Sequence, residues 1–180
     1  MEEQVGSEKI FEGKIINVVK DHVKLENGAF AYREVVYHHG GVCILALENN
    51  QIILVKQFRY PNRLETLEIP AGKLEQNEDT KECAFREFEE ETGYRANDMQ
   101  FIMKVLPSPG YTNEWLYLYE AKDFAQVEDS LPCDEDEVIE ILKLDLEEAY
   151  NKIVSGEIVD AKTVIAIMYA YNTRSNNLRQ

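Results

Sequence analysis

The chain has 180 residues, of which 44% are hydrophobic and 29% are charged, close to the values of an ordinary globular domain. No apolar run approaches the roughly 18 residues of a membrane-spanning helix. The acidic start of the chain also lacks the apolar segment of a signal peptide. We therefore expect one globular domain in the cytoplasm, not a membrane-bound, fibrous or disordered protein.

The charge balance is strongly acidic, with 19 Lys and Arg against 34 Asp and Glu and a net charge of −15. This charge disfavours binding to nucleic acids and to anionic membranes, because like charges repel. An anionic substrate would need a cation to neutralise both partners, and a divalent metal would serve. The simpler alternative is that the acidic charge only keeps the protein soluble.

The cysteines argue for a reducing compartment. Cys43, Cys83 and Cys133 are odd in number and widely spaced, and no Cys-x-x-Cys occurs. The pattern predicts neither a disulfide framework nor a zinc ribbon.

The first sixty residues favour β-strands. A β-rich run covers residues 14–25, a turn follows at 26–28, and a second extended run covers 32–37. Apolar runs at 42–47 and 52–58 are joined by a short Asn-rich segment, which predicts a hairpin in the core.

Helices follow later in the chain. One is predicted over residues 79–92 and ends at Gly93, and another begins at Asp145 and ends near Gly156. A last helix starts near Asp160. Further strands are predicted at 101–106, 114–121 and 138–144. Strands first and helices later indicate an α+β fold or a mixed-sheet sandwich.

The first predicted helix carries an unusual set of carboxylates. Glu87, Glu90 and Glu91 are three or four residues apart, so they share one face, whereas Ala84 and Phe88 mark an apolar face. Like charges at this spacing repel each other. One reading is a solvated acidic surface. The other is a site for a hard cation such as Mg²⁺, which prefers carboxylate oxygens, water and phosphate.

The wider pattern favours the second reading. The segment 72–94 resembles the Nudix box GX5EX7REUXEEXGU, in which U is apolar. Five residues separate Gly72 from Glu78, and seven more separate Glu78 from the run that starts at Arg86. Every fixed Gly, Glu and Arg is present. Phe88 and Tyr94 occupy the U positions and are bulkier than the usual aliphatic residues. Arg86 is expected to pair with a neighbouring carboxylate and orient it.

The resemblance extends over residues 11–171. The stretches REVVYHHGGV, LVKQFRYP, LEIPAGKLE, SPGYTNE and DAKTVIAIMYAY are similar to the ADP-ribose pyrophosphatase branch of the Nudix family, as is Pro109, fifteen residues beyond Tyr94. The resemblance implies an α/β/α sandwich with a mixed β-sheet. Residues 41–180 would form the Nudix hydrolase domain, and residues 1–40 an amino-terminal strand region of the same domain that serves dimerisation.

This resemblance also implies an activity and a set of site residues. The activity is Mg²⁺-dependent hydrolysis of the pyrophosphate bond of ADP-ribose to AMP and ribose 5-phosphate, with Mn²⁺ as an alternative metal. The implied metal ligands are the carbonyl of Ala71 and the side chains of Glu87, Glu90, Glu91 and Glu137. The implied substrate contacts are Arg33, Arg59, Ser108, Gly110 and Glu114.

The base in this branch lies outside the box, on an acidic loop before a late strand. Here that loop covers residues 133–137, and aligning the following strand makes Glu135 the catalytic base. A shift in the alignment would exchange the roles of Glu135 and Glu137.

Two alternatives remain open on the sequence. One is a Nudix hydrolase of another nucleoside diphosphate sugar, such as GDP-mannose. The other is a non-catalytic ligand-binding Nudix module, although such modules tend to lose the box glutamates that this chain keeps. In the leading interpretation the protein is a homodimer whose partner molecule is ADP-ribose or a related sugar nucleotide.

Overall fold

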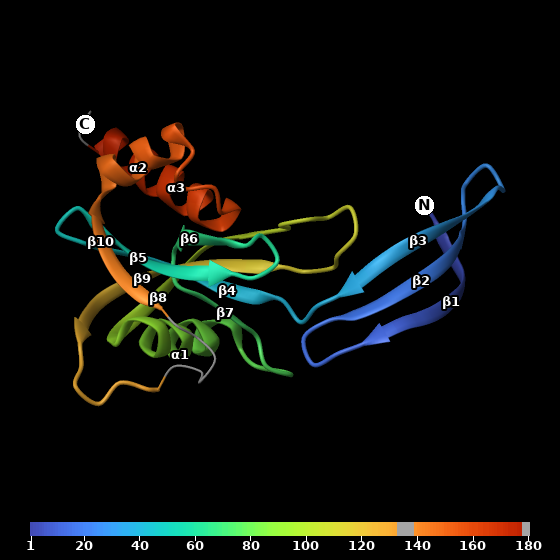
Figure 1. Cartoon of the computed structure of the whole chain (residues 1–180), viewed down its shortest axis with the longest axis horizontal. Coiled ribbons are helices and arrows are strands. Elements are labelled where there is room, and N and C mark those ends of the chain that lie inside the picture. Colours follow the sequence, from blue (N-terminus) through green and yellow to red (C-terminus); the bar gives the residue numbers. More distant parts are fainter. Residues whose placement is uncertain (133–138, 178–180) are drawn as a thin grey trace. The chain divides into compact units, whose positions relative to one another are not determined.

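The computed structural model describes residues 1–132 and 139–177 and contains two compact units (Figure 1). Unit 1 comprises Met1–Gly40 and Leu106–Trp115, and unit 2 comprises Gly41–Val105 and Leu116–Gln180. Each unit has its own β-sheet.

Unit 1 is built on an antiparallel sheet in the order β1-β2-β3. Its strands are β1 (Glu3–Glu12), β2 (Asn17–Lys24) and β3 (Phe30–Tyr37). The predicted turn closes between β2 and β3, where Gly28 adopts a φ of 83° and the N–H of Leu25 donates to the carbonyl of Ala29 at 2.8 Å. The loop of residues 106–115 adds to the unit, since the N–H of Val36 donates to the carbonyl of Tyr111 at 2.7 Å.

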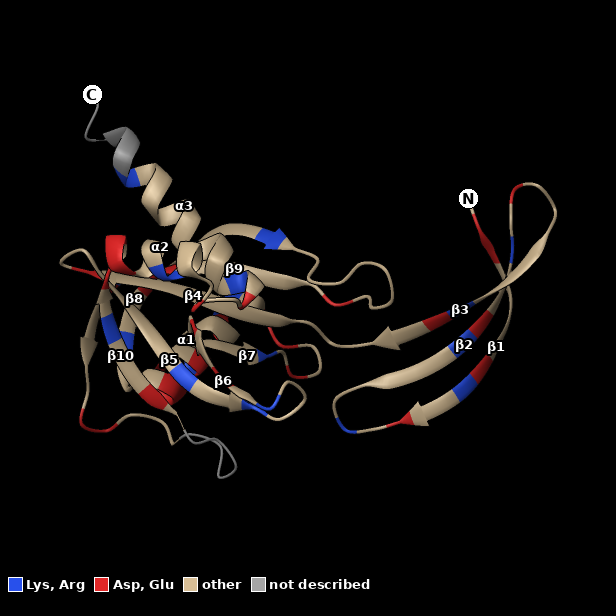
Figure 2. Ribbon diagram, turned by 45° about the horizontal axis from the view of Figure 1, so that its top comes forward, with Lys and Arg blue, Asp and Glu red and all other residues tan. Residues whose placement is uncertain are grey.

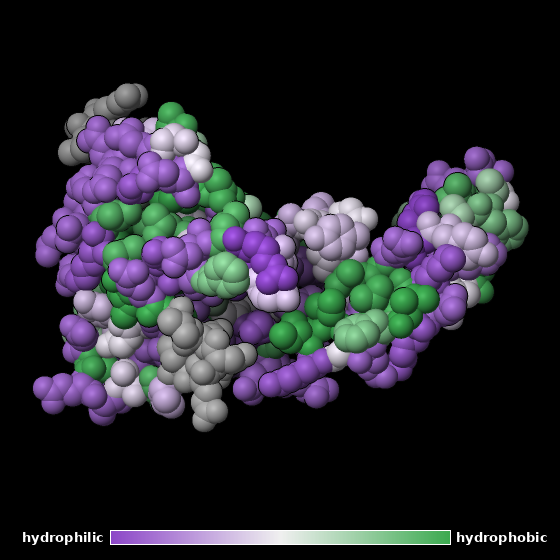
Figure 3. Space-filling view, in the orientation of Figure 1, coloured by the Kyte–Doolittle hydropathy of each residue, from purple (hydrophilic) through white to green (hydrophobic). Residues whose placement is uncertain are grey.

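Many large apolar side chains of unit 1 are exposed (Figure 3). They include Val5, Ile10, Phe11, Ile15, Ile16, Phe30, Tyr32 and Tyr37. Strand β1 is exposed along its whole length. It therefore shows no inside–outside alternation, and this is why the sequence pattern did not predict it.

Unit 2 contains a mixed sheet in the order β10-β5-β4-β9-β8, with β6 paired to β5 and β7 paired to β4. Its strands are β4 (Gly41–Glu48), β5 (Gln51–Arg59), β6 (Leu64–Glu68), β7 (Ala71–Lys73), β8 (Tyr94–Val105), β9 (Leu116–Gln126) and β10 (Glu140–Asp145). Strands β4 and β9 run parallel, and the other pairs are antiparallel. The predicted hairpin is confirmed, because β4 and β5 pair through a turn in which Asn49 and Asn50 both have positive φ.

The helices are α1 (Thr80–Thr92), α2 (Leu146–Ser155) and α3 (Ala161–Asn177). Asp79 caps α1 by accepting hydrogen bonds from two backbone N–H groups of its first turn, and Gly93 ends it in the left-handed conformation. Asp145 and Gly156 play the same parts for α2. The predicted ends of both helices are therefore confirmed.

The sheet of unit 2 lies between two helical layers, with α1 on one face and α2 and α3 on the other (Figure 1). Strand β4 shows why. Cys43 and Leu45 pack in the core beneath α2 and α3, whereas Val42, Ile44 and Ala46 pack in the core beneath α1. A strand covered on both faces is apolar throughout, as the sequence showed. The predicted α/β/α sandwich with a mixed sheet is confirmed.

Several boundaries differ from the prediction. Strand β8 begins at Tyr94 and not at residue 101, because antiparallel pairing with β9 holds its polar first half in the sheet. Strands β6 and β7 are short. Strand β6 turns back on the preceding strand β5, with Arg59 opposite Leu64, whereas β7 is fixed by pairing with the more distant β4. None of the described helices is long and apolar enough to span a membrane.

Candidate active site

The centre of the candidate site is the contact between helix α1 and strand β7. The carboxylate of Glu87 lies directly on the backbone of Gly72, so close that a Cβ on residue 72 would fall 1.7 Å from Cδ of Glu87. A second glycine supports this approach, since a Cβ on Gly41 would fall 2.7 Å from the carbonyl oxygen of Gly72. The two glycines leave room for an acidic side chain of the helix beside a bare strand backbone.

Arg86 links three carboxylates of the motif. Its Nε donates to Oε1 of Glu78 at 2.9 Å, and its Nη1 lies 2.8 Å from Oε2 of Glu90 and 2.9 Å from Oε1 of Glu87. The hydrogen bond from Arg86 lowers the pKa of Glu78. The pairing expected for Arg86 is confirmed, and it offsets the repulsion between the neighbouring glutamates.

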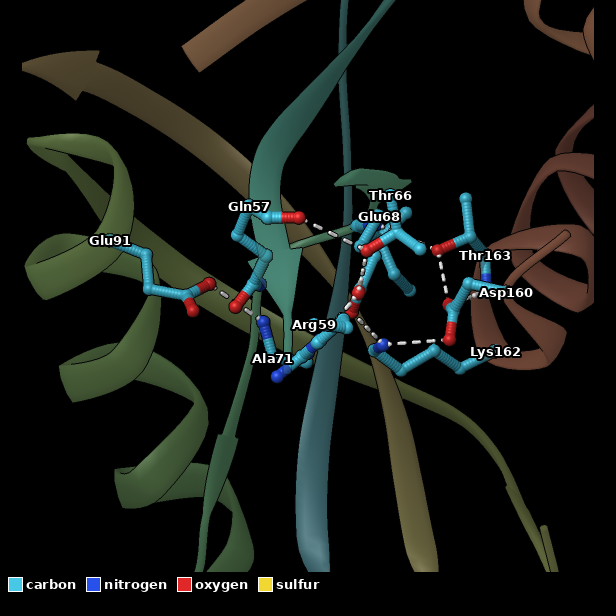
Figure 4. Close-up of polar contacts among 10 residues, drawn as sticks. Gln57, Arg59, Thr66, Glu68, Ala71, Glu91, Asp160, Lys162 and Thr163 are labelled. Atoms are coloured by element: carbon cyan, nitrogen blue, oxygen red, sulfur yellow. Dashed lines mark hydrogen bonds and ion pairs between the residues drawn. The ribbon is translucent and has the colours of Figure 1, made fainter. Parts of the chain in front are cut away.

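Glu91 fixes the strand on which Ala71 lies. It is buried, and its Oε2 accepts a hydrogen bond of 2.8 Å from the N–H of Ala71 (Figure 4). Helix α1 thus brings Glu87 to Gly72 and Glu91 to Ala71. These contacts join two parts of the motif that lie up to 20 residues apart in the sequence.

One glutamate of the acidic run has a different function. Glu89 is buried and forms a paired hydrogen bond with Arg95, at 2.8 and 2.7 Å, which lowers its pKa. Its carboxylate is therefore engaged in linking α1 to β8. Figure 2 marks the acidic residues of α1 in red; Glu89 pairs with Arg95, whereas Glu87 and Glu90 pair with Arg86.

Arg59 lies at the end of β5 in a second polar cluster of unit 2. It forms a two-pronged ion pair with the buried carboxylate of Glu68, in which both hydrogen bonds are 2.6 Å long. This contact raises the pKa of Arg59. A surface pocket of about 650 Å³ opens beside it. The pocket is lined by Arg59, Pro61, Asn62, Leu64, Thr66, Glu68, Val159, Asp160 and Ala161.

The other predicted substrate contacts belong to unit 1. Arg33 pairs with Glu2 on the exposed surface at 2.6 Å. The carbonyl of Ser108 accepts the N–H groups of a local turn, and a Cβ on Gly110 would meet no atom within 4 Å apart from its chain neighbours. Oε1 of Glu114 lies 3.5 Å from Nδ1 of His38. Glu135 and Glu137 lie outside the described residues.

The described side chains do not form a complete set of metal ligands by themselves. Within residues 1–132 and 139–177, no three side chains of His, Cys, Asp or Glu converge as metal ligands do. The contacts above give the reason, because Glu87 and Glu90 pair with Arg86 while Glu91 accepts the N–H of Ala71. The predicted ligand set also contains a backbone carbonyl, that of Ala71, and Glu137, which lies outside the described residues.

Sequence reasoning missed two residues, Glu68 and Lys162. Glu68 is 1% exposed, and Lys162, from α3, forms an ion pair with it. The two residues are 94 positions apart, so no local pattern links them. The available signal was that Glu68 and Lys162 lie in two of the stretches that resemble the ADP-ribose pyrophosphatase branch, LEIPAGKLE and DAKTVIAIMYAY.

Comparison with known proteins identifies the family of the chain. The family model described as NUDIX domain matches residues 37–164. The chain is 41% identical over 169 residues to the ADP-ribose pyrophosphatase of Bacillus subtilis (strain 168), covering 93% of this chain and 91% of that protein. The methanol dehydrogenase activator of Bacillus methanolicus has the same identity and the same coverage.

The fold has a solved counterpart as well. A crystal structure titled as an ADP compounds hydrolase superposes with a TM-score of 0.86 and 21% sequence identity, covering 99% of this chain and 97% of that one. Together with the family match over most of the chain, these similarities establish that the protein belongs to the Nudix family.

Proposed function

We propose that the protein hydrolyses the pyrophosphate bond of ADP-ribose, so that ADP-ribose and water give AMP and ribose 5-phosphate. The observation that carries the proposal is the carboxylate of Glu87 on the bare backbone of Gly72, next to Ala71 and Glu91. The identity with the Bacillus subtilis ADP-ribose pyrophosphatase supports the choice of substrate.

The donor set fits a divalent cation. The carbonyl of Ala71 and the carboxylates of Glu87 and Glu91 are hard oxygen donors, as Mg²⁺ prefers, and the missing Cβ of Gly72 leaves them room. Glu90 and Glu137 would complete the set, and Mn²⁺ would serve in place of Mg²⁺. When bound, the metal supplies charge neutralisation for the pyrophosphate and lowers the pKa of water.

The residues of the chain itself have three tasks. Arg59 is proposed to bind phosphate oxygens, for which a guanidinium offers paired donors. Arg33, Ser108, Gly110 and Glu114 are proposed to bind the remainder of the substrate. Glu135 is proposed as the general base that takes a proton from the attacking water, a role that requires an ionised carboxylate.

We further propose that the protein is a cytoplasmic homodimer. Residues 1–40 would form its dimerisation region and residues 41–180 its hydrolase domain. The exposed apolar side chains of unit 1 support this, since a monomer rarely leaves so many aliphatic and aromatic side chains together in water. The two described cysteines, Cys43 and Cys83, are buried and free, as suits a reducing compartment.

One experiment tests the activity. The protein is incubated with ADP-ribose, GDP-mannose and other nucleoside diphosphate sugars, with Mg²⁺ or with EDTA, and the released monophosphate is quantified. We expect AMP from ADP-ribose with Mg²⁺ only. Faster release of GMP from GDP-mannose would assign a different sugar nucleotide. If no compound releases a monophosphate, the protein is a ligand-binding module and not a hydrolase.

A second candidate function follows from the equal identity with the methanol dehydrogenase activator. If this protein has that role, adding it to a methanol dehydrogenase raises the rate of methanol oxidation. Comparison with the Glu91→Gln variant would show whether any stimulation depends on the hydrolase site. No stimulation by the unaltered protein would reject this candidate.

A further inference from the structure

Glu68 is the centre of a buried ionic cluster whose members come from separate stretches of the sequence. Its Oε1 accepts hydrogen bonds from Nε of Arg59 and from Oγ1 of Thr66, both at 2.6 Å, and its Oε2 accepts from Nη2 of Arg59 and from Nζ of Lys162 (Figure 4). Burial alone raises the pKa of this carboxyl, but these partners outweigh burial and lower it to about 2. Glu68 is therefore ionised whenever the protein is folded near neutral pH.

The cluster leaves one edge of Arg59 available. Nε and Nη2 both face Glu68, while Nη1 has no hydrogen-bond acceptor among the described residues. The side chain is 40% exposed and lines the pocket of about 650 Å³. A guanidinium that forms two hydrogen bonds to a carboxylate on one edge cannot rotate freely. Its opposite edge therefore keeps a fixed orientation.

Lys162, in the first turn of helix α3, completes the cluster. Its side chain is 10% exposed, and Nζ contacts both Glu68 and Oδ1 of Asp160, the latter at 3.0 Å. The charges of Arg59, Glu68, Lys162 and Asp160 balance. Without Lys162, Glu68 would remain buried with a single cationic partner, and Arg59 would be drawn more tightly toward it.

Helix α3 is also anchored by contacts other than those of Lys162. Oγ1 of Thr163 accepts the N–H of Ile69 at 2.8 Å and donates to Asp160 at 2.6 Å. Ala166 and Ile167 of the same helix are fully buried in the core. Removing the amino group of Lys162 therefore changes the electrostatics of the cluster and leaves the docking of α3 in place.

We propose that Lys162 is a positioning residue of the active site, which acts through Glu68 to hold Arg59 in the orientation that binds the pyrophosphate of the substrate. This inference rests on the proposed function. It assigns a role in substrate recognition to the start of α3, about one hundred residues along the chain from Arg59.

The first test separates binding from chemistry. We expect Lys162→Met to raise KM for ADP-ribose roughly tenfold while kcat changes less than about threefold, because an Arg59 drawn toward Glu68 makes a poorer phosphate contact and weakens ground-state binding. The control is Lys143→Met, which removes another lysine–glutamate ion pair of unit 2 that lies outside this cluster. Nζ of Lys143 is 2.7 Å from Oε2 of Glu48. An unchanged KM for Lys162→Met, or an equal rise for Lys143→Met, would overturn the proposal.

The second test is a double-mutant cycle on the binding of inorganic pyrophosphate, measured by calorimetry in EDTA for wild type, Arg59→Ala, Lys162→Met and the double variant. If Lys162 acts through Arg59, Lys162→Met weakens binding in the wild type and has no further effect when Arg59 is absent. An equal loss in both backgrounds, or no effect in either, would reject the inference. Should Lys162→Met fail to fold, Lys162→Gln takes its place.

These measurements also separate the two proposals. Wild-type protein that fails to hydrolyse ADP-ribose contradicts the proposed function, and the pyrophosphate cycle still decides the role of Lys162. Hydrolysis of ADP-ribose together with an additive cycle contradicts the positioning role alone.

Discussion

The carboxylate of Glu87 occupies the space that a Cβ of residue 72 would need. A Cβ built on Gly72 would lie 1.7 Å from Cδ of Glu87 and about as close to both carboxylate oxygens, at 2.0 and 2.1 Å. This contact explains why the motif pairs a glycine with a glutamate fifteen residues later. The absent side chain is what lets the helix reach the strand backbone.

Gly72→Ala is expected to impair the site without unfolding the protein. The clash falls on the end of a flexible side chain, so Glu87 can swing away and the backbone need not move. We expect the Mg²⁺ concentration for half-maximal rate to rise about 10- to 100-fold, the usual effect of disturbing a ligand's support. The measurements are a metal titration of the rate and a thermal melt.

The matched control is Gly6→Ala. A Cβ there would lie 3.8 Å from Cβ of His22, an ordinary contact. Equal metal dependence in wild type and Gly72→Ala would show that the position of Glu87 is unimportant.

Glu91→Gln is expected to retain the fold and lose activity. An amide oxygen can still accept the hydrogen bond from the N–H of Ala71, but the negative charge is gone. We expect the rate to fall by a factor of roughly 10² to 10⁴. Glu89→Gln is the control on the same helix, because Glu89 pairs with Arg95, and its rate should match that of the wild type. A fully active Glu91→Gln together with a fully active Glu87→Gln would refute the metal interpretation.

The acidic loop allows the base and the additional ligand to be told apart. Glu135→Gln is expected to bind substrate normally while turnover falls by a factor of roughly 10² to 10⁴. Glu137→Gln is expected instead to raise the Mg²⁺ requirement, since it would remove a ligand. Steady-state kinetics at several Mg²⁺ concentrations distinguish the two patterns. The reverse result would identify Glu137 as the base. If both Glu135→Gln and Glu137→Gln are fully active, the base is a different residue.

The buried Glu68 makes stability depend on acid pH in a defined direction. Its pKa is about 2 in the folded protein against 4.5 for an unperturbed glutamate. As pH falls below 4.5 the unfolded chain binds a proton that the folded protein does not bind until about pH 2. The ionised Glu68 therefore stabilises the folded protein above pH 4.5. This contribution, about 3 kcal/mol of the free energy of unfolding, is lost as the pH falls from 4.5 to about 2.

Lys162→Met provides the check on this contribution. Loss of the amino group should raise the pKa of Glu68 in the folded protein, so the free energy of unfolding of the variant should fall less between about pH 5 and pH 3. Urea unfolding of both proteins at these two pH values gives the comparison. Parallel decreases would mean that Lys162 does not stabilise the ionised form of Glu68.

The exposed apolar residues of unit 1 predict self-association. We expect sedimentation equilibrium at micromolar protein to give twice the chain mass of 20.8 kDa. Phe11→Arg, at a side chain that is 53% exposed, should shift the equilibrium toward monomer. Val154→Arg is the control, because it alters an exposed apolar residue of α2 in unit 2. A wild-type mass near that of one chain would exclude the dimer.

Local patterns predicted much of the fold because their causes are local. Helix α1 could be delimited from Asp79 and Gly93, since capping hydrogen bonds involve neighbours in the sequence. The hairpin of β4 and β5 followed from two apolar runs and a short Asn-rich connection. Strands β1 and β7 were missed, because β1 has no buried face and the three-residue β7 forms through pairing with the distant strand β4.

The sequence by itself determined the spacing of the carboxylates, and with it the candidate metal site of a Nudix protein. Only the tertiary structure decided which contact each glutamate makes. Glu87 lies on Gly72 and Glu91 holds Ala71, whereas Glu89, in the same acidic run, is paired with Arg95. The cluster of Glu68 with Lys162 was invisible in the sequence, because contacts between distant segments depend on how helices and strands pack, and no local pattern encodes that packing.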